Sequence, residues 1–94
     1  MNDGTFAAAV KSFDQIESQN TRITEAKQLI HNNCLSCNQV RQLILLFSLE
    51  ESRLEIAKYA YDHTFDKQNY YKVNDTFTFE ASVDELNRYI QGRK

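Results

Sequence analysis

The sequence contains no proline and only two glycines, Gly4 and Gly92, so it lacks the residues on which most tight turns depend. Both residue types also destabilise helix interiors, but β-hairpins need them more, and their scarcity therefore favours helices. No apolar stretch approaches the ~20 residues that cross a bilayer. The N-terminus lacks the basic start and apolar segment of a signal peptide, which leaves the compartment open.

An excess of positive charge is also missing. Eleven Lys and Arg residues stand against thirteen Asp and Glu residues, for a net charge of −2. Binding to a phosphate backbone needs clustered positive charge, so we expect no nucleic-acid partner. A DNA-binding helix-turn-helix is the disfavoured alternative, because its central helix would carry only Arg41 as a cation.

Glycine-flanked nucleophiles and glycine-rich phosphate loops are absent as well. Asp62 and His63 are adjacent, and neighbours on a helix do not face each other. We therefore expect a chain without catalytic residues and without a cofactor.

What is present is one domain over residues 1–94, with enough apolar residues, 41 %, to fill a core. Apolar residues recur at helical spacing along most of the chain. The predicted helices cover about 5–18, 21–31, 37–47, 49–64 and 82–91, with Asn20 and Thr21 capping the second. Because residues 43–47 are apolar on every side, that segment is predicted to lie buried at the centre.

Capping boxes mark three of these starts. They are Ser36 with Gln39, Ser48 with Glu51, and Ser82 with Glu85. Residues 66–80 combine turn formers with aromatics, which predicts an ordered loop held by its rings. The predicted fold is all-α, a compact bundle of about five short helices around a buried central helix, with this aromatic loop before the last helix.

A short motif occurs twice. Arg22-x-x-x-Ala26-Lys27 recurs as Arg53-x-x-x-Ala57-Lys58, thirty-one residues later. Two stacked helix-turn-helix units would produce this pattern. Two unrelated amphipathic helices that share a few letters would produce it too, and both explanations stay open.

Several stretches together resemble the family known as domain of unknown function 4476, over about residues 3–91. The stretches are Ala26-Lys27, Asn33-Cys34-Leu35, Gln39-Val40, Leu46-Phe47-Ser48, Arg53-Leu54, Ala57-Lys58-Tyr59-Ala60-Tyr61-Asp62, Asn69-Tyr70-Tyr71-Lys72-Val73-Asn74-Asp75, Phe77 and Asp84-Glu85-Leu86. Members usually form the C-terminal end of longer, exported bacterial proteins. The resemblance implies an exported or cell-envelope setting, and it carries over no active site.

Cys34-x-x-Cys37 is the most obvious chemical motif. A redox pair of this spacing normally lies in a βαβ unit, which this chain lacks, so two structural thiols are the favoured interpretation, and a reversible disulfide is the alternative. Zinc is disfavoured, although His31 and His63 could complete a four-ligand set, because no second ligand pair accompanies the cysteines. Cys37 also departs from the family pattern.

The tyrosines are the main candidates for an exposed site. Tyr59, Tyr70, Tyr71 and Tyr89 cannot all be buried with satisfied hydroxyls, and tyrosine is enriched at protein interfaces. The competing explanation is that their rings hold the 66–80 segment. The sequence favours a non-catalytic module that binds an unknown protein or peptide, with a homo-oligomer left open. Thiol-redox or metal-dependent activity at Cys34 and Cys37 is the alternative.

Overall fold

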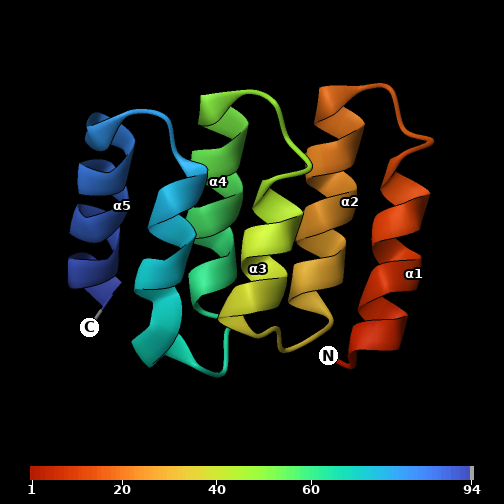
Figure 1. Cartoon of the computed structure of the whole chain (residues 1–94), viewed down its shortest axis with the longest axis horizontal. Coiled ribbons are helices and arrows are strands. Elements are labelled where there is room, and N and C mark those ends of the chain that lie inside the picture. The colour runs from red at the N-terminus through yellow and green to blue at the C-terminus, as the bar shows by residue number, and fades with distance from the viewer. Residues whose placement is uncertain (94) are drawn as a thin grey trace.

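The computed structural model describes residues 1–93, and no strand occurs in them, so the predicted all-α class is confirmed. The elements in chain order are α1 (Asp3–Phe13), α2 (Gln19–His31), α3 (Cys37–Ile44), α4 (Glu50–Tyr61), the 3-10 helix η1 (Lys67–Thr76) and α5 (Glu80–Arg93) (Figure 1).

The helices form two layers, each built from every second element. In one layer α4 packs between α2 and α5, and in the other α3 packs between α1 and η1. Consecutive elements run in opposite directions, so the connecting turns lie at two opposite edges of the molecule (Figure 1). The molecule measures 33 × 25 × 18 Å between its Cα extremes, and the short dimension accommodates two helix layers.

The two copies of the repeated motif make the same contacts. Arg22 donates from Nε to the carbonyl oxygen of Ile16 at 2.5 Å and from Nη1 to that of Leu46 at 3.2 Å. Arg53 donates from the same atoms to the carbonyl oxygens of Phe47, at 2.6 Å, and of Thr76, at 2.7 Å. We call each of these contact sets an arginine clamp. In both, one arginine joins the ends of two neighbouring elements in the opposite layer.

The lysine of each copy also makes the same ion pair. Lys27 of α2 pairs with Glu55 of α4, and Lys58 of α4 pairs with Glu85 of α5, each at 2.6 Å. The step from α2 to α4 is therefore repeated from α4 to α5. We call α2 with α3 the first unit and α4 with η1 the second unit, and α5 begins a third. The stacking of helical units, one of the two explanations that the sequence leaves open, is present, with a spacing of thirty to thirty-one residues.

The apolar segment 43–47 is only partly as predicted. Leu43, Ile44 and Phe47 are buried, but Leu45 is 45 % exposed and Leu46 is half-buried. The prediction that all five lie inside is wrong because α3 ends at Ile44. The chain then turns at the edge of the molecule, where one side of the turn faces water.

The predicted start of α2 is also wrong. Its N-cap is Ser18, whose hydroxyl accepts from the Thr21 amide, whereas Asn20 lies inside the helix. Helix α1 correspondingly ends at Phe13, five residues earlier than predicted, because residues 14–17 form the turn that leads to this cap.

Of the three capping boxes, only the first exists as predicted. Ser36 and Gln39 exchange both hydrogen bonds at 3.1 Å. The box of Ser48 with Glu51 is wrong, because the residue before the first turn of α4 is Leu49, which has no capping side chain.

The last helix begins at Glu80, two residues before the predicted cap. Glu50 replaces that cap from outside the helix, since its carboxylate accepts from the amides of Thr78 and Phe79 at 3.0 Å. Ser82 instead lies buried in the first turn. The sequence 66–80 is ordered as predicted, but most of it is η1 rather than a loop, with Tyr70 and Val73 packed inward.

Candidate functional site

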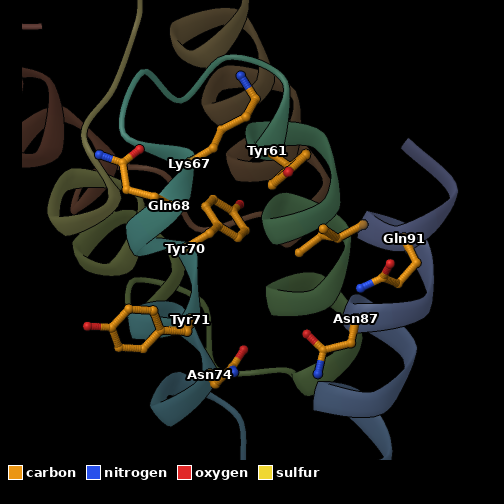
Figure 2. Close-up of a pocket in the computed structure, with 9 residues that line it drawn as sticks. Tyr61, Lys67, Gln68, Tyr70, Tyr71, Asn74, Asn87 and Gln91 are labelled. Carbon is orange, nitrogen blue, oxygen red and sulfur yellow. The ribbon is translucent and has the colours of Figure 1, made fainter. Parts of the chain in front are cut away.

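A cleft of about 360 Å³ opens between η1 and α5, with the end of α4 as its floor (Figure 2). We call it the terminal cleft. Five of its nine lining residues carry an amide or ammonium group, three are tyrosines and one is aliphatic. They are Lys67, Gln68, Asn74, Asn87, Gln91, Tyr61, Tyr70, Tyr71 and Ile90. No carboxylate occurs among these residues, so the lining offers hydrogen bonds and a single positive charge.

Two of the tyrosines form the rigid base of the cleft. Tyr70 is 3 % exposed, its hydroxyl donates to the carbonyl oxygen of Ala57, and its ring meets that of Tyr61 edge-on with centroids 5.0 Å apart. Burial raises the pKa of Tyr70, so this phenol stays protonated. Tyr70 therefore positions η1 against α4, which fits the interpretation that ring packing holds this segment.

Tyr71 is the exposed member of the predicted set. It is 65 % exposed and stands at the rim of the terminal cleft. It also borders a second hollow of about 490 Å³ that Arg41 and Asp75 line. Arg41 donates to both carboxylate oxygens of Asp75, at 2.8 and 3.0 Å, and this pairing holds the pKa of Asp75 below its ordinary value. Tyr71 thus lies between two hollows, on a surface that the ion pair of Arg41 with Asp75 holds in place.

The other two predicted tyrosines lie away from the terminal cleft. Tyr59 is half-buried on α4, with the Lys27 ammonium 5.4 Å from its ring centroid. Tyr89 is half-buried on α5, with the Lys58 ammonium 5.8 Å from its ring centroid. These equivalent contacts belong to the stacking of units. The structure therefore does not gather the four tyrosines into one surface.

The two cysteines are unpaired and differ in environment. Cys34 is exposed, whereas Cys37 is buried at the start of α3. Burial, together with hydrogen bonding to Asp66, raises the pKa of Cys37 to about 12. A thiol with such a high pKa is a poor nucleophile, so the environment of Cys37 disfavours redox chemistry.

The histidines considered as zinc ligands do meet. The rings of His31 and His63 lie edge to face with centroids 5.8 Å apart, and Tyr59 stacks on His63 at 5.6 Å. Among residues 1–93, however, no group of three or more His, Cys, Asp or Glu side chains is arranged to hold a metal ion.

The amide side chains of the terminal cleft were not predicted from the sequence. The repeat spacing contains the signal that would have found them. Asn87 and Gln91 of α5 correspond to the residues thirty positions earlier on α4, Ala57 and Tyr61. Both of these are buried beneath η1 in the second unit. Asn87 and Gln91 are polar, whereas the equivalent positions in the second unit are buried. This difference indicates that their face of α5 is open to water or to a ligand.

No curated protein and no solved structure matches the chain. Within residues 1–93, no helix has the length and apolar character needed to span a membrane. One family matches residues 1–90, with the description "Domain of unknown function (DUF4476)". The match covers nearly the whole chain, and the chain belongs to the DUF4476 family.

Proposed function

We propose that the chain is a non-catalytic protein- or peptide-interaction module and that the terminal cleft is its binding surface. The observation that carries this proposal is Tyr71, a largely exposed aromatic at the rim of a hollow lined by other tyrosines and by amides. Tyrosine supplies a large contact area at low entropy cost, and it is enriched at interfaces.

The chemistry of the lining favours a peptide over a small apolar ligand. Pockets for small molecules are lined mainly by apolar side chains with a few polar groups. Here amide and ammonium groups make up most of the lining. Amides both donate and accept hydrogen bonds, as the polar groups of a peptide do. The base formed by Tyr61 and Tyr70 is already packed, so binding would order few protein groups.

We further propose that the module works inside a larger, exported bacterial protein. The resemblance of the sequence to the C-terminal domains of such proteins supports this setting.

The test is a pull-down with three immobilised chains: wild type, Tyr71→Ala and Phe79→Ala. Phe79 is the matched control because it is an equally exposed aromatic, 61 % against 65 %, at the start of α5 and outside the cleft lining. Tyr70 is left unchanged because its burial would make an alanine variant a test of folding. Circular dichroism and urea unfolding establish that all three chains are folded.

The expected result is a partner that wild type and Phe79→Ala retain and that Tyr71→Ala loses. If Tyr71→Ala retains every captured protein, or if wild type captures nothing, the terminal cleft is not the binding surface.

A further inference from the structure

The terminal cleft repeats, one unit later, a groove that the chain fills with its own residues. That inner groove lies between α3 and α4, and η1 packs into it against both helices. Tyr70 lies buried there, bonded to the carbonyl oxygen of Ala57 and packed on Tyr61. Thirty residues on, η1 and α5 take the places of α3 and α4 and border the terminal cleft. The occupant of the inner groove therefore serves as a template for a ligand of the terminal cleft.

Helices α3 and η1, which occupy corresponding positions in the first and second units, share a pattern of apolar residues. Val40, Leu43 and Phe47 are buried on and just after α3. In the next unit, Tyr70 and Val73 are buried at the corresponding positions of η1, and Phe77 is half-buried. In both sets the first two side chains lie three residues apart on the helix, and the third follows four residues later, just after the helix ends.

The charged contacts of the inner groove add a second requirement for a ligand of the terminal cleft. Asp66 precedes Tyr70 by four residues, and its carboxylate accepts from the Cys37 amide at 2.8 Å, at the start of α3. The corresponding residue at the start of η1 is Lys67. Within the described chain, the Lys67 ammonium bonds only to the carbonyl oxygens of Asp62 and Thr64. An acidic side chain of a ligand, placed as Asp66 is placed in the inner groove, would lie near the backbone amide of Lys67 and near its ammonium group.

The differences between the two grooves indicate reversible binding. The arginine of the clamps, Arg22 and Arg53, is replaced by Val83 in α5, so no guanidinium is placed to clamp the end of a third occupant. Asn87 and Gln91 replace the buried Ala57 and Tyr61. These polar residues tolerate water in the cleft, and they can form hydrogen bonds with a bound helix.

We propose that the terminal cleft binds an amphipathic helical segment of a partner protein. The segment carries apolar residues at i, i+3 and i+7 and an acidic residue four positions before the first of them. The inference rests on the proposed function, since it names the class of ligand for the same cleft.

The experiment is a selection from a displayed library of random 16-residue peptides on the wild-type chain, with Tyr71→Ala and Phe79→Ala as counter-targets. Enriched peptides are then synthesised, and their binding is measured by fluorescence anisotropy. Amide chemical shifts map the binding site on the chain. Two peptide variants test the pattern: one moves the third apolar residue from i+7 to i+6, and one replaces the acidic residue by its amide.

The expected outcome is enrichment of the spaced apolar pattern, with shifts concentrated in η1 and α5. Tyr71→Ala should weaken binding about tenfold, and Phe79→Ala should leave it unchanged. Moving the third apolar residue should abolish binding. Replacing the acidic residue should weaken binding about threefold at low salt and less at high salt.

Other outcomes separate this inference from the proposed function. Peptides that bind the cleft without helical spacing, for example as extended chains, would overturn the inference and leave the proposed function standing. Absence of any peptide that depends on Tyr71 would overturn both. Concentration-dependent association of the chain with itself, abolished by Tyr71→Ala, would identify a second copy as the occupant and overturn the inferred partner.

Discussion

Replacing Arg53 by methionine tests whether the arginine clamp stabilises the second unit. The guanidinium donates to the carbonyl oxygens of Phe47 and Thr76 at 2.6 and 2.7 Å, so one side chain joins the turn after α3 to the end of η1. Methionine retains most of the unbranched stem but has no donor. The substitution therefore preserves the packing of the stem and leaves both carbonyl groups without this partner.

The expected decrease in the free energy of unfolding follows from the two lost hydrogen bonds. A hydrogen bond from a charged donor contributes about 1.5–3 kcal/mol, which gives about 3–6 kcal/mol for the pair. Because Arg53 is half-buried, water reaches part of the site, and we expect the free energy of unfolding to fall by about 2–3 kcal/mol. Arg22→Met removes the equivalent pair. One of its bonds is longer, 3.2 Å, so we expect a smaller loss of about 1–2 kcal/mol.

Urea unfolding followed by circular dichroism measures these losses. Arg88→Met is the matched control, because Arg88 is an exposed arginine on α5, and its replacement should change the free energy by less than about 0.5 kcal/mol. The reasoning is refuted if Arg53→Met behaves like Arg88→Met. A larger loss for Arg22→Met than for Arg53→Met would show that bond length does not govern the clamp.

Two further predictions concern titratable groups. Burial tends to raise the pKa of Glu50, but the amide donors of Phe79 and Thr78 hold it below its ordinary value of 4.5. Its carboxylate therefore adds stability that is present above pH 4.5 and is lost as the pH falls through the lower folded pKa. The Tm of Glu50→Gln should decline less steeply than that of wild type across this acid range, whereas parallel curves would contradict the capping role. In the native chain, a thiol reagent at pH 8 should modify Cys34 quickly and Cys37 only in denaturant, since burial raises the pKa of Cys37 to about 12. Two fast phases, or a fast phase that survives in Cys34→Ser, would disprove this difference.

Helix positions were predictable because apolar spacing is a local property of the chain. Ser36 with Gln39 was correctly identified for the same reason, since both partners of that box lie within four residues. The start of α5 was not predictable in this way. The amides of Thr78 and Phe79, just before the helix, donate to Glu50, about thirty residues away in sequence, and only the packing of α4 beside α5 brings that carboxylate there.

The candidate site was predictable only in part. Tyrosine content drew attention to Tyr71, which is exposed, but the burial of Tyr70 depends on α4, which local sequence does not reveal. The amides of Asn87 and Gln91 belong to a helix face whose exposure depends on the stacking of whole units. The repeated arginine and lysine motif contained that information, because its spacing relates each cleft residue to a buried counterpart.

The stacking of units also bears on how the chain acquires its structure. The clamps and ion pairs between units join residues 6 to 34 positions apart, and none of them ties α1 to α5. Interactions of such short reach close small loops, which lowers the entropic barrier and favours fast folding. They also allow one end to open while the rest stays intact, as in other linear arrays. Amide hydrogen exchange should then be slowest in α3 and α4 and fastest toward the two chain ends, so α5 could rearrange around a ligand without melting the interior.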